Sequence, residues 1–286
     1  MSTASASDLT VDDAIVLQDS NRLTLRLMPC DVVAKVAPVD LRASAEFEVE
    51  LTRRLTETDS PVAALDPRVE PRVYEHDGFA INMWTYYESV SPRVLPPAEY
   101  ARALERLHVG MRQIDPRTPH FTDRVAQAQH LVGSREDTPA LTDADRELLS
   151  TALRDATRSI GERGAAEQLL HGEPHPGNLL GTARGLLFID LETCCRGPVE
   201  FDIAHVPEAV SEHYPDLDRE LLGECRALTL AMVAAWRWDR ADLHPDGPRA
   251  GHELLRALRA GPPWPTVETV WRRLDRSSDP PGGEPA

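Results

Sequence analysis

Cysteines are scarce in this sequence, and none occurs in a CxxC pair. Its 286 residues include 4 cysteines, at positions 30, 194, 195 and 225. Neither a disulfide framework nor a cysteine-based zinc site is expected from this pattern. The same pattern favours a reducing environment, so we predict a cytoplasmic protein.

Long apolar runs are also missing. No stretch approaches the roughly 20 residues that a membrane-spanning helix needs. The first residues, MSTASASDLT, lack the basic and then apolar segments of a secretory signal. We therefore expect no membrane association and a short disordered tail at the start. The stretch 277–286 is rich in proline and glycine, which predicts a second disordered tail.

Positive charge is in deficit. The chain has 31 lysines and arginines against 47 aspartates and glutamates, for a formal net charge of −16. Proteins that bind nucleic acids present basic patches to the phosphate backbone, so nucleic acid is not expected as the main partner. An acidic surface is compatible with a cationic small ligand, although it is equally explained by solubility alone.

Apolar residues make up 41% of the chain, which is enough for a substantial core. Alternating apolar residues predict strands over 21–28 and 32–36, joined as a hairpin. Two further strands are predicted over 69–74 and 79–87, and a helix over 41–57. Helical spacing then dominates, apart from a predicted strand at 186–189, and predicts helices over 98–114, 121–132, 143–162, 217–236, 249–259 and 265–274. Strands first and helices later predict an α+β fold of two lobes.

A short polar segment interrupts the helical part. It reads His171-Gly-Glu-Pro-His-Pro-Gly-Asn178, and an apolar stretch then leads to Asp190-Leu-Glu192. A carboxylate that orients an attacking hydroxyl, and an amide and a carboxylate that hold magnesium, are the groups that phosphoryl transfer needs. An unpaired carboxylate at the end of an apolar strand would be costly, and a metal ion would offset that cost at Asp190.

Each of these residues also has a structural explanation. Glu173 alone would be an ordinary loop acid, and Asn178 alone a turn residue. Glu192 is either a second metal ligand or a structural partner. Asp202 comes just before a predicted helix, where it suits an N-cap. Lys35 is alternatively a strand-end lysine whose ammonium reaches solvent.

The two histidines around Glu173 superficially match the H-E-x-x-H pattern of zinc proteases. That pattern requires a helix, and Gly172, Pro174 and Pro176 preclude one here. We therefore interpret His171 as a structural residue that braces the loop.

Taken together, these motifs resemble the signature of the aminoglycoside phosphotransferases and related small-molecule kinases. That signature reads His-Gly-Asp-x-His-x-Gly-Asn, then Ile-Asp-(Phe/Trp)-Glu, then Gly-Pro-x-x-x-Asp-(Ile/Leu)-Ala. The matching residues are His171, Gly172, His175, Pro176, Gly177, Asn178, Asp190, Glu192, Gly197, Pro198, Asp202, Ile203 and Ala204. The acid and the asparagine keep the spacing of the protein-kinase pattern H-R-D-L-x-x-x-N.

The resemblance implies a protein-kinase-like α+β fold. It predicts a β-rich nucleotide-binding lobe over 1–88 and a helical lobe over 89–286. It also implies an enzyme that uses ATP or GTP and Mg²⁺ to phosphorylate a hydroxyl of a small molecule, cationic ones such as aminoglycosides included. A role in antibiotic resistance would follow for an aminoglycoside acceptor. A monomer and a homodimer both remain open.

The resemblance assigns the site residues. Glu173 is catalytic, Asn178, Asp190 and Glu192 bind the metal, and Asp202 braces the loop together with His171. In the first lobe, Lys35 resembles the strand lysine that binds the nucleotide's phosphates, and Glu48 resembles its helical partner, with Glu46 and Glu50 as rivals. The segment Trp84-Thr-Tyr-Tyr87 falls where the adenine-binding hinge lies, which makes Trp84 and Tyr86 candidate nucleotide contacts.

Two departures from the family pattern stand out. No G-x-G-x-x-G loop is present, and the corresponding turn lies near Gln18–Arg22. The catalytic aspartate of the family is replaced by Glu173, which is one methylene longer. Two alternatives therefore stay open beside an aminoglycoside kinase: a pseudokinase that binds nucleotide or ligand without efficient transfer, and a kinase for a housekeeping amino-alcohol metabolite.

Overall fold

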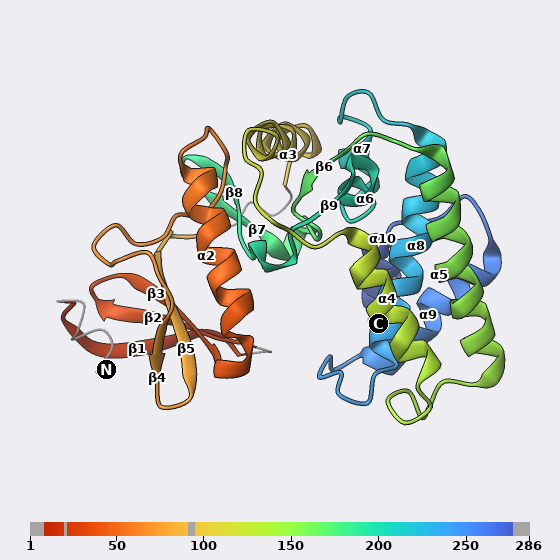
Figure 1. Ribbon diagram of the computed structural model, residues 1–286, viewed down its shortest axis with the longest axis horizontal. Coiled ribbons are helices and arrows are strands. Elements are labelled where there is room, and N and C mark those ends of the chain that lie inside the picture. The colour runs from red at the N-terminus through yellow and green to blue at the C-terminus, as the bar shows by residue number, and fades with distance from the viewer. Residues whose placement is uncertain (1–8, 20–21, 91–94, 277–286) are drawn as a thin grey trace, which may run out of the picture. The chain divides into compact units, whose positions relative to one another are not determined.

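The computed structural model describes residues 9–19, 22–90 and 95–276 (Figure 1). Both predicted tails lie outside these residues, apart from Leu9 and Thr10, and so do residues 20 and 21 of the turn near Gln18–Arg22. The chain forms two compact units, one running to Arg117 and including Gly177–Cys194, the other made of Thr118–Pro176 and the chain from Cys195 onward. This division differs from the expected lobes of 1–88 and 89–286.

The first unit is built on an antiparallel sheet of five strands. Their order is β1 (Val11–Asp19), β2 (Leu23–Pro29), β3 (Val32–Pro38), β5 (Phe79–Thr85) and β4 (Tyr74–His76). The predicted hairpin is confirmed as β2 and β3, which pair in antiparallel register. Strand β1 was not expected from the sequence because it lies at the sheet edge and has no buried face to impose an alternating pattern.

The strand predicted over 69–74 is largely wrong. Residues 69–73 have no strand structure, and β4 begins only at Tyr74. Pro67 and Pro71 cannot donate to a sheet ladder. The Asp66 carboxylate instead accepts a hydrogen bond from the Arg68 backbone N–H at 3.0 Å, which holds the segment in a turn.

Helix α2 (Arg42–Thr56) follows the short 3-10 helix η1 (Val39–Leu41) and packs against β5. It confirms the helix predicted over 41–57. Its buried residues recur at helical spacing, as expected for an amphipathic helix, and include the acid Glu48 alongside Val49, Leu51 and Leu55. The fold thus carries one glutamate of this helix into the interior of the unit.

Helix α3 (Pro97–Met111) and the hairpin of β7 (Leu179–Thr182) and β8 (Gly185–Phe188) complete the first unit. Phe188 is fully buried, and its backbone N–H donates to the Pro61 carbonyl at 2.7 Å. Because Asn178 comes just before β7 and Asp190 just after β8, the hairpin brings them to the same end. The Ile189 N–H donates to the Asn178 carbonyl at 3.1 Å there.

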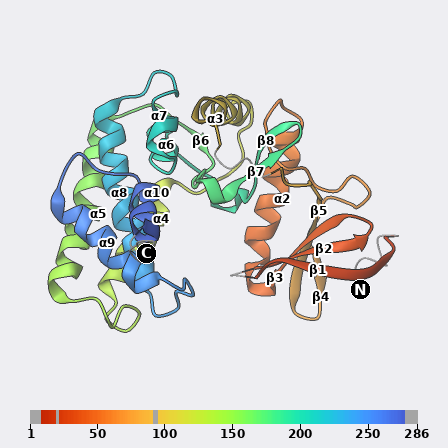
Figure 2. The same cartoon turned by 180° about the vertical axis from the view of Figure 1, so that it is seen from behind.

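The second unit is mainly helical (Figure 2). Its helices are α4 (Phe121–Gly133), α5 (Asp143–Arg163), α6 (Val199–Ile203), α7 (Glu208–Ser211), α8 (Arg219–Arg237), α9 (Gly247–Ala260) and α10 (Val267–Arg276). Helix α8 packs between α5 and α9, and its buried residues include Leu228, Ala231 and Ala235. A two-stranded antiparallel sheet joins β6 (Glu167–Leu170) to β9 (Cys195–Pro198).

The helices predicted for this part of the chain are confirmed, with ends that shift by a few residues. Thr142 is the N-cap of α5, because its hydroxyl accepts from the Asp145 N–H at 3.2 Å. The five-stranded antiparallel sheet belongs to the first unit and most of the helices belong to the second, which confirms the predicted α+β class. In the described part of the chain, no helix has the length and apolar character needed to cross a membrane.

Candidate functional site

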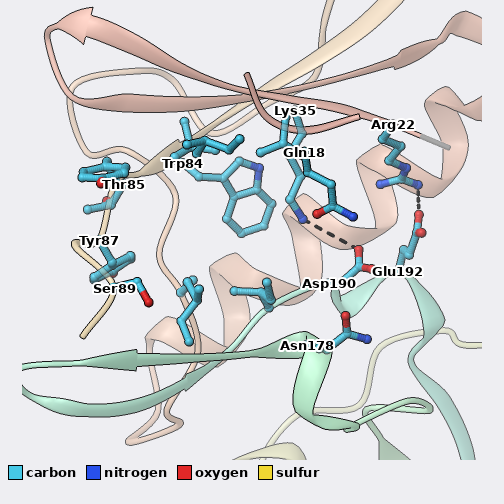
Figure 3. Close-up of a pocket in the computed structure, with 18 residues that line it drawn as sticks. Gln18, Arg22, Lys35, Trp84, Thr85, Tyr87, Ser89, Asn178, Asp190 and Glu192 are labelled. Atoms are coloured by element: carbon cyan, nitrogen blue, oxygen red, sulfur yellow. Dashed lines mark ion pairs between the residues drawn. The ribbon is translucent and has the colours of Figure 1, made fainter. Parts of the chain in front are cut away.

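A cavity of about 470 Å³ opens in the first unit (Figure 3). Its wall comes from β1, β2, β3, the end of β5 with the segment after it, and residues that flank the β7–β8 hairpin. The size is typical of small-molecule sites. The polar residues that line it and enter the argument below are Arg22, Lys35, Tyr86, Asn178, Asp190 and Glu192.

Lys35 and Glu48 form an ion pair at this cavity. The Lys35 Nζ lies 2.6 Å from Oε1 of Glu48, and the carboxylate is fully buried while the lysine side chain remains 16% exposed. Strand β3 carries the lysine and α2 carries the acid. A buried carboxylate requires such a partner, so Glu48 fixes the ammonium at the cavity wall.

The two rival glutamates of α2 do not reach the lysine. Glu46 pairs with Arg42 on the exposed surface, and Glu50 pairs with Arg53 and Arg54. These pairs link neighbours along one helix. The structure therefore brings together Lys35 and Glu48 and leaves both rivals outside the cavity.

Asn178 and Asp190 line the same cavity from the two ends of the β7–β8 hairpin. Asp190 has a left-handed backbone, with φ of 67°, and Oδ1 of its carboxylate lies 3.8 Å from Nζ of Lys35 (Figure 3). An amide oxygen and a carboxylate are hard donors of the kind that Mg²⁺ prefers, and that ion keeps several waters. This donor set fits a magnesium ion held partly by a nucleotide's phosphates.

Glu192 has two partners in the first unit. Its Oε2 accepts a hydrogen bond from the Ser44 hydroxyl at 3.0 Å and forms an ion pair with Arg22. Among the described residues, no three histidines, cysteines, aspartates or glutamates gather in a cluster able to hold a metal ion. These contacts fit a structural partner, and the role of Glu192 as a metal ligand stays a prediction.

Trp84 and Tyr86 both line the cavity. Trp84 is buried in β5, its indole N–H donates to Oδ1 of Asn82 at 2.8 Å, and Nζ of Lys35 lies 4.6 Å from its ring centroid. Tyr86 follows β5, and the Arg26 guanidinium stacks over its ring at 3.8 Å. Of the two aromatic residues, Trp84 thus also supports Lys35.

Glu173 lies in the second unit, where it pairs with Arg124 of α4. The two side chains are 20% and 15% exposed. Burial raises the pKa of the Glu173 carboxyl, but Arg124, His205 and His175 together outweigh it, with the charge of Arg124 the largest of these effects. The pKa therefore lies below its usual value. The carboxylate is thus held ionised and in one orientation.

Asp202 and His171 hold the loop that carries Glu173. The buried Asp202 carboxylate accepts hydrogen bonds from the backbone N–H groups of His171 and Gly172, both at 2.8 Å. Nδ1 of the buried His171 ring accepts from the Glu173 N–H at 3.4 Å. The N-cap prediction for Asp202 is wrong, because α6 already begins at Val199 and its N-cap is Pro198.

Three residues near these sites escaped the sequence reasoning. Arg22 lines the cavity, Arg124 pairs with Glu173, and His205 is buried beside that pair. Burial lowers the pKa of His205 to about 4. No motif marks any of the three, because their roles come from contacts between distant parts of the chain.

The composition of the chain also marks Lys35. Lys35 is the only lysine of the chain, and the other members of the 31 lysines and arginines are all arginine. Lysine is a compact point charge on a flexible stem, whereas arginine is a wide planar fork. That the only lysine lies at the cavity is consistent with a need for a compact ammonium there, where a planar guanidinium would not fit the same contacts.

Comparison with known proteins places the chain in a family. The model of the phosphotransferase enzyme family (APH) matches residues 16–242. The chain belongs to this family. No curated protein sequence matches it significantly. Membership makes the chain a small-molecule phosphotransferase by family, and it agrees with the resemblance of the loop and strand motifs.

Solved structures share the fold. Amicoumacin kinase hAmiN, in complex with AMP-PNP, Ca²⁺ and Ami, has a TM-score of 0.71 at 12% identity, over 94% of this chain and 96% of that one. Choline kinase LicA from Streptococcus pneumoniae has a TM-score of 0.66 at 13% identity, over 91% and 97%. Aminoglycoside phosphotransferase APH(3'')-Id from Streptomyces rimosus, with ADP and streptomycin, has a TM-score of 0.58 at 19% identity, also over 91% and 97%. The predicted kinase-like fold is confirmed.

Proposed function

We propose that this protein transfers the γ-phosphate of ATP, or of GTP, to a hydroxyl group of a small molecule with the help of Mg²⁺. One observation carries the proposal: the Lys35–Glu48 ion pair, Asn178 and Asp190 meet at a single cavity. These groups match the parts that kinases use to hold a triphosphate. Solved relatives with AMP-PNP or with ADP bound support a nucleotide in this fold.

Each group has a defined task in this proposal. Lys35 binds the phosphates, and Glu48 orients its ammonium. Asn178 and Asp190 hold the metal ion, which when bound supplies charge neutralisation for the phosphates. Trp84 and Tyr86 contact the nucleotide. Phosphoryl transfer asks mainly for positioning and electrostatic stabilisation, so a preassembled set of charges at one cavity suits it.

Glu173 is proposed to orient the acceptor hydroxyl and to receive its proton. The acceptor is a small hydroxylated molecule, either an amine such as an aminoglycoside or an amino-alcohol metabolite. The net charge of −16 supports a cationic acceptor, because it raises the local concentration of cations. The cysteine pattern, four residues without a CxxC pair, supports action in the cytoplasm.

A second function, nucleotide binding without efficient transfer, has one observation in its favour. Glu173 already carries an ion pair with Arg124, and this pair lowers the pKa of its carboxyl. A carboxylate with a lowered pKa is a weak base. Because transfer depends more on placement than on base strength, we favour the active enzyme.

The deciding experiment is magnesium-dependent nucleotide consumption with a panel of aminoglycosides and small amino alcohols. The wild type should turn over with at least one acceptor, and Asp190→Ala should reduce the rate by at least about 100-fold, in the range seen for the loss of one electrostatic contact. Nucleotide binding without turnover by any acceptor would favour the second function. No nucleotide binding at all would overturn both.

A further inference from the structure

The turn between β1 and β2 lies where kinases carry a glycine-rich loop. Such loops work because glycine lets backbone N–H groups approach the phosphates closely. The segment Val11–Pro29, which spans both strands and the turn, contains no glycine. Some other group must provide the contacts if this end of the cavity binds phosphate.

Arg22 occupies this position. It comes directly before β2 and lines the cavity, and its side chain is only 12% exposed. Figure 3 shows its guanidinium on the same side of the cavity as Lys35, above Glu192. Its Nη2 donates to the Ser44 hydroxyl at 3.0 Å and pairs with the Glu192 carboxylate. The side chain therefore reaches inward across the cavity wall.

Glu48 contacts both cations of the cavity. Its Oε1 lies 2.6 Å from Nζ of Lys35, and its Oε2 lies 3.4 Å from Nη1 of Arg22. The Lys35 contact is short. The Arg22 contact is long, so Nη1 can leave Glu48 and donate to a stronger acceptor such as a phosphate oxygen. One fully buried carboxylate thus organises an ammonium and a guanidinium side by side.

We propose that Arg22 binds the terminal phosphates of the nucleotide and forms with Lys35 a two-cation clamp that takes the place of a glycine-rich loop. Glu48 orients both cations, and Glu192 with Ser44 holds Nη2 of the guanidinium. The inference rests on the proposed nucleotide binding. Guanidinium groups suit this task because their planar fork matches phosphate oxygens in two-point contacts.

The clamp also accounts for the contacts of Glu192. With its Oε2 engaged by Arg22 and Ser44, this carboxylate positions a phosphate-binding residue, and Asp190 and Asn178 remain to hold the metal ion. A magnesium ion that shares its coordination with phosphates and waters needs few protein ligands.

The test compares ligands that differ only in phosphate number. Dissociation constants for adenosine, AMP, ADP and ATP with Mg²⁺ are measured by calorimetry on the wild type and on Arg22→Ala, Arg22→Lys and Glu192→Gln. Arg42→Ala is the matched control, since Arg42 also pairs with two carboxylates, Glu46 and Glu75, but lies outside the cavity lining.

Arg22→Ala should weaken ATP about tenfold or more and leave adenosine within about twofold, because a charge-assisted contact is lost only where phosphates are present. Arg22→Lys should recover part of the loss, Glu192→Gln should cost less than Arg22→Ala, and Arg42→Ala should match the wild type. Equal weakening of ATP and adenosine, or none, would overturn the clamp while nucleotide binding stands. A folded wild type that binds neither these four ligands nor guanosine, GMP, GDP and GTP would overturn the proposed function itself.

Discussion

Each of the two compact units contains a partly buried ion pair between a glutamate and a cation. The two pairs differ in which member supports the other. In the first unit Glu48 is fully buried, and its partner Lys35 keeps 16% exposure at the cavity. In the second unit the acid Glu173 lies in the motif loop, and Arg124 of α4 supports it with 15% of its own side chain exposed. The acid is the support in one pair, and the cation is the support in the other.

In the proposed function, this difference corresponds to the partner that each unit presents to a ligand. A supporting residue is held by packing, as Glu48 is in the core of α2, and as Arg124 is by the Trp236 ring 5.1 Å from its guanidinium carbon. The other residue of each pair, Lys35 or Glu173, is the one presented to a ligand. Its partner holds its charge in a fixed position. A cation presented to phosphates and an acid presented to a hydroxyl are the two charges that a kinase requires.

The largest effect is expected from removing the presented cation of the first pair. Lys35→Met should lower kcat/KM by roughly 10²–10³-fold, the size seen when one preorganised electrostatic contact to a transition state is lost. Glu48→Gln, which leaves the ammonium in place but unoriented, should cost less. The measurement is the initial rate as a function of nucleotide concentration at saturating acceptor, which gives kcat/KM for the nucleotide. Equal losses for both variants would contradict the proposed division between presented and supporting residues.

The sole lysine allows the same comparison without an acceptor. An amine-directed acylating reagent can modify only Lys35 and the terminal amine, so mass spectrometry gives a direct measure of the lysine's accessibility. Bound ATP with Mg²⁺ should slow the acylation of Lys35 about tenfold or more, since phosphate contacts occupy its ammonium. Acylation of the terminal amine is the internal control and should not change. An unprotected Lys35 in the presence of bound ATP would place the phosphates elsewhere.

Shortening the presented acid of the second pair tests whether glutamate is matched to Arg124. Glu173→Asp withdraws the carboxylate by one methylene, and a misplacement of about 1 Å can cost about 100-fold in rate. We expect kcat to fall by roughly that factor while nucleotide affinity stays within about twofold. A gain of activity in Glu173→Asp would show that the longer side chain has impaired the enzyme.

Removing the support of the second pair should change the pH profile. In the wild type the Glu173 pKa lies below its usual value, so the carboxylate is ionised at neutral pH and its contribution is lost only as acid lowers the pH through that depressed value. Arg124→Ala leaves the burial that raises the pKa and removes the largest of the charges that lower it. The acid limb of kcat should therefore move to higher pH, with about a tenfold loss at neutral pH.

Arg124→Lys should restore part of both effects, because it keeps a positive charge but not the planar contact. The readout is kcat against pH from about 5 to 8 for the three proteins. A rate loss in Arg124→Ala with an unmoved acid limb would mean that Arg124 acts on folding of the loop and not on the carboxyl group.

The sequence predicted the first pair better than the second, for a physical reason. Lys35 lies on a predicted strand and Glu48 on a predicted helix, and the family resemblance pointed to Glu48 with Glu46 and Glu50 as rivals. The observed ion pair and burial then separated Glu48 from the other two. Arg124 is one of many arginines on helices, and nothing along the chain marks its contact with a loop 49 positions away.

The fold shows the same limit. Helices with strong periodicity were predicted to within a few residues, whereas β1 and the short strands β6, β7 and β9 were missed. A short or exposed strand is defined by its pairing partner, and pairing is not visible in local sequence. The roles of Arg22 and Glu192 were missed or left open for that reason too, because both depend on side chains that the sheet and the hairpin bring together.

The smallest expected effect concerns the surroundings of the second pair. His205 is buried with Glu173, Arg124, Asp202 and His175 acting on its charge, and its pKa is lowered from 6.5 to about 4. The unfolded chain therefore binds this proton more readily, so the stability that comes from a neutral His205 is present above about pH 6.5 and is lost as the pH falls toward 4.

Between pH 7 and pH 5 this single group should reduce the free energy of unfolding by about 2 kcal/mol. His205→Asn and His205→Phe remove the titrating ring, so both variants should lose less stability over that interval than the wild type in denaturant titrations. A wild type that loses no more stability than its variants would mean that solvent reaches His205. The neighbouring Glu173–Arg124 pair would then also be more hydrated, and Arg124 would lower the pKa of Glu173 less strongly.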